Sequence, residues 1–385
     1  MELFNSFILT GGLFLLLFAG IDYLSHKLKF SSIIFILILG IISGFFMEEF
    51  NALHTIAEIG IILLFFLLGL EFPLKRMMDI FKRSWAAGLI DILLNIFISL
   101  LISLTFNLDL ITSFFIGAIV YASSSSITLK LLEEKKRMAN KETEFILALL
   151  IFEDLVAPIM VSFFAGIYQG ENFSLSFIST LLIQIVLLTV GAILVGHFVF
   201  RHMSSFIEKH LDKEFIPLFT IGVAFSYAGL ALYLGLSEVL GAFLAGIMLS
   251  ETGKASDLEY LILPVRNITL PFFYFWFGST IYLEKGITWP GLLLVLVIWS
   301  IIAKFLVSYT GGQIFGLSRK VAIRGGFSLV QRGEFSAIIA ALAPVTLRTF
   351  AGIYILITAF IGIIFFNMAP EWSKKLSVIL KNHLT

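Results

Sequence analysis

Two adjacent carboxylic acids, Glu153 and Asp154, lie in an otherwise apolar stretch that reads A-L-L-I-F-E-D-L-V-A-P. An ionisable group inside a membrane-length apolar segment is costly, and it usually faces a protein interior or a water-filled cavity on an ion pathway. Adjacent residues on a helix point about 100° apart, so the two carboxylates need different partners. We expect one of them to hold a buried positive charge. The other should face a cavity, where a proton and a monovalent cation compete for it.

Three more charged residues lie in apolar segments. Lys304 occurs in W-S-I-I-A-K-F-L, and Arg332 and Glu334 occur in S-L-V-Q-R-G-E-F-S-A. Lys304 is the expected charge-balancing partner of the acidic pair. Arg332 and Glu334 are two positions apart and point to different sides of a helix, so Arg332 needs another acid. We assign Arg332, Glu334, Asp91 and Glu71 to a structural charge pair, in which the acid that holds Arg332 is Asp91 or Glu71.

Two of the apolar segments should be interrupted. One contains four consecutive serines, Ser123 to Ser126, which lower helix propensity and offer hydroxyl groups to freed backbone groups. The other contains Gly325, Gly326 and Gly333 within a dozen residues. Interrupted segments in corresponding halves of a chain indicate a transporter site near the bilayer midplane.

The composition of the chain places these segments in a membrane. Of its 385 residues, 59% are hydrophobic and 14% are charged, and a bilayer core is crossed by about 20 apolar residues of helix. Breaking the chain at its polar clusters predicts an all-α polytopic membrane protein with thirteen transmembrane helices. The predicted segments are 4–25, 31–47, 52–70, 85–106, 109–132, 144–168, 177–200, 215–234, 236–251, 267–283, 288–310, 321–344 and 349–370.

The order of these segments predicts an internal symmetry. The interrupted segments, 109–132 and 321–344, are seven crossings apart and therefore run in opposite directions. Each is the fifth of six segments, with 177–200 as the connector between the two sets. We predict inverted six-helix repeats whose two broken helices cross.

The basic residues predict the orientation. Of the 26 Lys and Arg residues, 22 lie in alternate loops, at the segment ends that adjoin these loops or in the C-terminal tail, whereas only Lys285 and Arg348 lie in the other loops. The positive-inside rule then places the N-terminus outside and the C-terminus in the cytoplasm. The membrane expected is a bacterial-type inner membrane. Because the loops are short, residues 1–370 should form one membrane domain. Residues 371–385 read as a short cytoplasmic amphipathic tail on the membrane surface.

Several chemistries find no support in the sequence. The chain has no cysteine, which excludes thiol and iron–sulfur chemistry. No glycine-rich phosphate loop follows a strand pattern, and no H-E-x-x-H motif is present. We expect no cofactor, no enzymatic activity and no nucleic-acid partner. The expected partners are the transported ions and membrane lipid.

Taken together, the motifs resemble the cation/proton antiporter 2 family, the monovalent cation:proton exchangers that include Kef-type potassium efflux systems. The matching motifs are F-F-L-L-G-L-E-F at 65–72, A-S-S-S-S at 122–126, F-E-D-L-V-A-P at 152–158, L-G-A-F-L-A-G-I-M-L-S at 240–250, Lys304 in its segment and R-G-E-F at 332–335. Their order and spacing extend along most of the chain.

The resemblance implies roles for particular residues. Asp154 aligns with the aspartate that binds the transported monovalent cation and the proton. Lys304 aligns with a lysine that pairs with the preceding acidic position, here Glu153. Ser124 and Ser125 align with small hydroxyl residues at the crossing of the broken helices.

The resemblance also implies an assembly. It predicts a homodimer of thirteen-helix protomers, each with a dimerisation scaffold and a core formed by about 85–168 and 288–370. Relatives commonly carry Asp, Asn or Gln at the position of Glu153, and this difference bears on stoichiometry and electrogenicity. Kef-type proteins continue into a nucleotide-binding domain that we do not expect here, which leaves a separate regulatory subunit as an open alternative.

The function predicted is secondary active antiport of Na⁺ or K⁺ against H⁺ by alternating access, with a role in pH homeostasis. The main alternative is a sodium-coupled solute symporter of similar fold, which would need a roomier and more polar cavity. A channel would need a continuous pore in place of one midplane acidic focus. An intramembrane enzyme would need a catalytic motif that the sequence lacks.

Overall fold

The computed structural model describes residues 7–28, 30–46, 51–168, 175–203, 215–283 and 286–382. Within these ranges all regular elements are helices, as predicted. Nine of the described helices are long and apolar enough to cross a membrane, and two shorter apolar helices accompany them. Each predicted segment coincides with a helix, a continuous run of helices or an interrupted pair, whereas the number of crossings stays a prediction.

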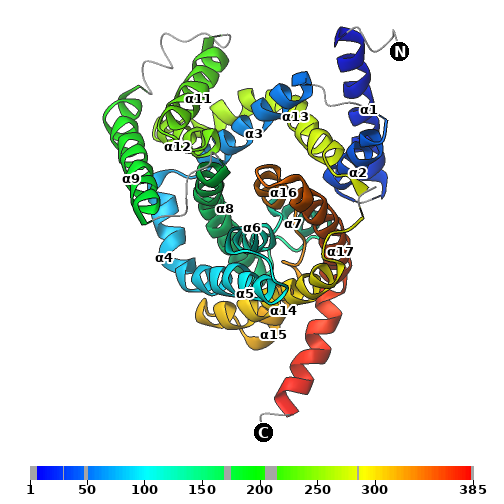
Figure 1. Ribbon diagram of the computed structural model, residues 1–385. Coiled ribbons are helices and arrows are strands. Elements are labelled where there is room, and N and C mark those ends of the chain that lie inside the picture. The colour runs from blue at the N-terminus through cyan, green and yellow to red at the C-terminus, as the bar shows by residue number, and fades with distance from the viewer. Residues whose placement is uncertain are drawn as a thin grey trace.

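One group of helices forms an arc (Figure 1). In the arc α9 and α11 both pack on α12, and the packing continues from α12 through α3, α13 and α2 to α1. Their bounds are α1 (Phe7–Leu28), α2 (Ser32–Gly44), α3 (Asn51–Leu70), α9 (Leu175–Phe198), η3 (Phe200–His202), α11 (Phe215–Tyr233), α12 (Glu238–Ser250) and α13 (Ala255–Ser279).

The second group, which we call the core group, lies inside and below the arc in the view of Figure 1. It joins two stretches that are far apart in the sequence. Its members are α4 (Leu74–Asp91), η2 (Ile92–Phe97), α5 (Ile98–Thr105), α6 (Leu110–Tyr121), α7 (Ser125–Glu134), α8 (Lys141–Tyr168), α14 (Pro290–Ile314), α15 (Arg319–Phe327), α16 (Glu334–Ala341) and α17 (Val345–Asn382).

Glycine pairs hold the arc together at close range. A Cβ atom at Gly69 of α3 would lie 2.0 Å from the carbonyl oxygen of Phe243 on α12, beside Gly246. Gly40 of α2 and Gly278 of α13 meet in the same way. Apolar side chains gain little by leaving lipid, so membrane helices associate through such close backbone contacts.

Both predicted interruptions are present, and they cross. The break between α6 and α7 lies at 122–124, and the break between α15 and α16 lies at 328–333. The Ser124 N–H donates to the carbonyl oxygen of Gln331 at 2.9 Å, which ties the two breaks together. At Gly333 a Cβ atom would lie 2.5 Å from Ser124 Oγ, so only glycine allows this approach.

The predicted segment 349–370 and the start of the predicted tail lie on one continuous helix. This helix, α17, runs from Val345 to Asn382 with Pro370 inside it. Its C-terminal part extends away from the other helices (Figure 1). Proline removes one backbone donor without necessarily ending a membrane helix, because neighbouring groups satisfy the freed carbonyl.

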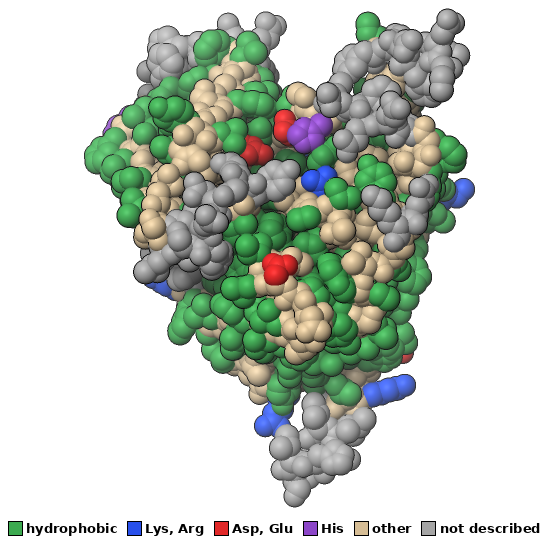
Figure 2. Space-filling view, viewed as in Figure 1, with side chains coloured by type: hydrophobic (Ala, Val, Ile, Leu, Met, Phe, Trp, Pro, Cys, Tyr) green, Lys and Arg blue, Asp and Glu red, His purple; other side chains and the backbone are tan. Residues whose placement is uncertain are grey.

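The outer surface is apolar. Large hydrophobic side chains are exposed on the arc, including Leu16 of α1 (73%), Phe198 of α9 (67%) and Tyr233 of α11 (87%). Figure 2 shows a face dominated by hydrophobic side chains with few charged ones. Such a surface is stable against lipid and not against water, as expected of a multi-pass membrane protein.

Candidate ion-binding site

Asp154 lies on α8, beside the N-terminal end of α7. The Ser125 hydroxyl donates to both of its carboxylate oxygens, at 2.8 Å and 2.9 Å. The side chain is 4% exposed, and within the described part of the chain no Lys, Arg or His forms an ion pair with it. Asp154 is therefore a nearly buried carboxylate whose charge has no fixed partner.

Glu153 points to a different set of groups, as predicted for adjacent residues on a helix. Lys304 Nζ lies 2.9 Å from its Oε1. The Ser123 N–H also donates to Glu153, and the Ser123 hydroxyl donates to it at 3.3 Å. Glu153 thus binds the break between α6 and α7 and shares the charge of Lys304, and both side chains are fully buried.

Lys304 has a second acidic partner that the sequence did not indicate. Its Nζ lies 2.7 Å from Asp91 Oδ1, and Asp91 is also fully buried. Asn95 donates to the same oxygen at 2.8 Å. Asp91 directly precedes the π-helical turn η2, which contains Asn95, and π-turns in longer helices are frequent at functional sites.

Arg332 is fully buried and lies in the break before α16. Among the described residues, its guanidinium group donates only to neutral oxygen atoms. The acceptors are the carbonyl oxygens of Val120 at 2.7 Å, Leu329 at 3.2 Å and Val330 at 3.0 Å, and Asn95 Oδ1 at 3.2 Å.

The predicted acidic partners of Arg332 were wrong. Asp91 is bound to Lys304, and neither Asp91 nor Glu71 is among the groups that accept from Arg332. The physical reason is that two helix interruptions leave carbonyl oxygens without intrahelical donors, and a guanidinium group has five N–H donors to offer them. Asn95 connects Arg332 to Asp91 indirectly.

We predict that Arg332→Ala lowers stability. The change leaves four buried acceptors without this donor, and each unsatisfied buried group costs about 1–3 kcal/mol. The apparent melting temperature in detergent should therefore fall strongly, with a smaller fall for Arg332→Lys, which keeps the charge. An unchanged melting temperature together with an altered cation affinity would instead place Arg332 in the transport site.

Glu334 occupies a different position from the structural charge pair that we predicted. Its Oε2 accepts from the hydroxyls of Ser124 at 2.8 Å and Ser126 at 3.0 Å, and its Oε1 accepts from the Ser126 N–H at 3.2 Å. It is 5% exposed. Glu334 therefore belongs to the polar crossing and does not contribute to holding Arg332.

Two buried amide side chains were not predicted as part of the site. Asn95 bridges Asp91 and Arg332. Gln331 donates to Thr128 of α7 and to the Ser328 carbonyl oxygen, so it ties the break before α16 to α7. Both are polar side chains in apolar surroundings, as in L-L-N-I-F for Asn95. An amide within an apolar segment is therefore a signal for a buried polar contact, as a charged residue is.

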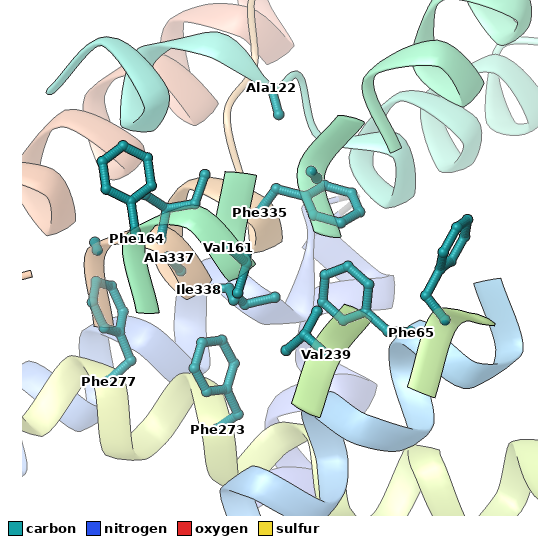
Figure 3. Packing of buried hydrophobic residues seen from close by; sticks show 14 of the residues in the cluster. Phe65, Ala122, Val161, Phe164, Val239, Phe273, Phe277, Phe335, Ala337 and Ile338 are labelled. Atoms are coloured by element: carbon teal, nitrogen blue, oxygen red, sulfur yellow. The ribbon is translucent and has the colours of Figure 1, made fainter. Parts of the chain in front are cut away.

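Apolar side chains pack between α16 and the arc beside the crossing. Figure 3 shows Phe335 and Ile338 of this contact together with Phe65 and Val161. The rings of Phe65 and Phe335 meet edge to face with their centres 5.5 Å apart. The core group thus meets the arc through hydrophobic surface at this position, next to its most polar groups.

An unpaired carboxylate and a buried ion-pair network at the crossing of two interrupted membrane helices are typical of secondary ion transporters. The family model described as "Sodium/hydrogen exchanger, transmembrane" matches residues 13–369. The chain therefore belongs to the sodium/hydrogen exchanger family. It is a cation/proton antiporter and not an enzyme.

Individual relatives agree with this family. The chain is 45% identical to the ammonium/H⁺ antiporter subunit AmhT of Alkalihalophilus pseudofirmus over 97% of both chains. It is 31% identical to the K⁺/H⁺ antiporter subunit KhtU of Bacillus subtilis, over 91% of this chain and 90% of that protein. The fold is similar to the structure of the sodium proton antiporter MjNhaP1 from Methanocaldococcus jannaschii, with a TM-score of 0.70, 20% identity and coverage of 98% and 99% of the two chains.

Proposed function

We propose that Asp154 is the group that carries the cation and the proton in turn, with Ser125 beside it. The observation that carries this proposal is the environment of Asp154. It is a nearly buried carboxylate that is hydrogen-bonded to one serine hydroxyl and has no fixed cation among the described residues. An empty, ionised Asp154 is costly to move through an apolar surrounding, whereas a protonated or cation-bound Asp154 is neutral. This difference couples the two fluxes.

The transported ion is a small monovalent cation, and we extend the expected Na⁺ or K⁺ to include NH₄⁺. Relatives named as ammonium/H⁺, K⁺/H⁺ and Na⁺/H⁺ antiporters support each of these ions. Sodium-coupled solute symport is not favoured, because these three relatives are all named as antiporters.

The two groups of helices suggest how the site alternates between the two sides. We assign the part of the core group at about 85–168 and 288–370 to the moving unit and the arc to the scaffold that dimerises. Glu153 and Lys304 travel with Asp154 as a fixed pair in the core group. The inverted repeats inferred from the sequence would make the two end states similar in energy.

The assembly proposed is a homodimer in the inner membrane, with the N-terminus outside and the C-terminus in the cytoplasm. A separate regulatory subunit is also proposed, because two relatives are themselves named as antiporter subunits. The end of α17, residues 371–382, carries basic residues and extends beyond the bundle, which suits the membrane surface or such a partner.

The test is proton flux in proteoliposomes reported by a pH-sensitive dye. After a pH gradient is set, addition of the transported cation should dissipate it, and no organic solute should be required. Na⁺, K⁺, Li⁺, Rb⁺ and NH₄⁺ are added separately, with choline as the non-transported control. For NH₄⁺, protein-free vesicles correct for diffusion of NH₃. Dissipation by none of the cations would contradict the proposed function.

A further inference from the structure

A cavity between the arc and the core group reaches the polar crossing. Its volume is about 620 Å³, and its walls come from α1, α2, α3 and α13 on one side and from the crossing on the other. The charged and most polar residues that line it are Asp22, Ser126, Arg266, Asn267, Tyr274 and Glu334. Asp154 and Ser125 are not part of the lining, so Glu334 is the carboxylate of the crossing that the cavity meets.

Among the described residues, Glu334 and Asp154 lack the positive partner that the other three buried carboxylates of the core group have. Asp91 and Glu153 both pair with Lys304, and Glu142 pairs with Arg137 and Arg324. Within the described residues Glu334 accepts only from serine groups, and it is 95% buried. An ionised carboxylate in this state is compensated only if a cation or a proton joins it.

We propose that Glu334 is a second ion ligand of the transport site, which receives the cation from the cavity and passes it to Asp154. This inference rests on the proposed function of Asp154. Carboxylate and hydroxyl oxygens are the ligands that hard cations prefer. The hydroxyls of Ser124 and Ser126 donate to Glu334, and their Oγ atoms lie 3.3 Å apart. Ser125, between them in the sequence, donates to Asp154. Three consecutive serines thus serve the two carboxylates, Ser124 and Ser126 on Glu334 and Ser125 on Asp154.

A purely structural role for Glu334 would be to cap α7 through the Ser126 N–H. Glu334→Gln separates this role from ion binding, because an amide oxygen still accepts a hydrogen bond but carries no charge. Glu334→Ala removes both the charge and the cap. Comparing the two variants therefore shows which function the residue has.

The experiment measures the cation KM of wild type and Glu334→Gln in oriented proteoliposomes, with the cation supplied to the cavity side or to the opposite side. We expect the KM on the cavity side to rise about tenfold, equivalent to the loss of one ligand worth about 1.4 kcal/mol. The KM on the opposite side should change much less. Because a ligand discriminates between ions, the ratio of the KM values for Na⁺, K⁺ and NH₄⁺ should also change.

Arg266→Gln is the matched control, since Arg266 lines the same cavity with the opposite charge. Loss of its positive field should lower the KM of all three cations by a common factor. If Glu334→Gln also changes all three by a common factor, on both sides, Glu334 acts only through its field and the inference is overturned. The inference is equally overturned if Glu334→Gln and Glu334→Ala lower the melting temperature alike and leave the KM unchanged.

A second measurement does not depend on transport. Bound cation should raise the melting temperature of the detergent-solubilised wild type, and Glu334→Gln should lose most of this rise. An inactive wild type would contradict the proposed function alone. A normal wild type with an unaltered cation-induced rise in Glu334→Gln would contradict only the role of Glu334.

Discussion

Asp154→Asn is expected to abolish cation-stimulated proton movement in proteoliposomes while leaving the fold intact. The carboxamide has nearly the same shape, and its oxygen still accepts from the Ser125 hydroxyl. It can neither bind a proton near neutral pH nor balance a cation. Exchange should therefore fall to the level of empty vesicles, and the melting temperature in detergent should stay close to that of the wild type.

Asp109→Asn provides the matched control. Asp109 is exposed, lies outside the apolar part of α6 and caps that helix by accepting from the Thr112 N–H at 2.9 Å. Asparagine caps helices as well as aspartate does, so this variant should exchange cations normally. Near-normal exchange by a well-folded Asp154→Asn variant would contradict the mechanism, because another group would then have to carry the ions.

The parts of this site that the sequence predicted are those fixed by local rules. Long apolar runs predicted the helices, and the serine run at 123–126 and the glycines near 333 predicted the two breaks. The divergence of neighbouring side chains predicted that Glu153 and Asp154 would have different partners. These rules depend on residues a few positions apart, so they can be applied without knowing the packing.

The parts that could not be predicted depend on contacts between distant segments. Asp91 and Lys304 are 213 positions apart, and Arg332 and Asn95 are 237 apart. From the charged residues alone, an acidic side chain such as Asp91 was expected to pair with Arg332. This expectation was wrong because backbone carbonyl oxygens at the breaks also accept from Arg332, and the positions of charged side chains do not reveal them.

The largest effect on stability is expected for Lys304. Its ammonium group lies between Asp91 and Glu153, and all three side chains are fully buried. Lys304→Gln leaves two carboxylates close together without their shared cation, and removing one partner of a buried pair costs about 3–5 kcal/mol. The variant should have a markedly lower melting temperature in detergent. Lys130→Gln is the control, since Lys130 donates to the carbonyl oxygen of Phe30. This variant should change stability little.

Removing the acids together with the base should restore part of this loss. In Lys304→Gln/Glu153→Gln only Asp91 keeps its charge, and Asn95 still connects it to the positive charge of Arg332. The double variant should therefore be more stable than Lys304→Gln alone, and adding Asp91→Asn should raise the melting temperature further. This order measures the coupling of the three groups directly, because independent residues would give additive losses. If the losses simply add, the three charges do not stabilise one another. Lys304 would then line the ion pathway and would not be the structural centre of the core group.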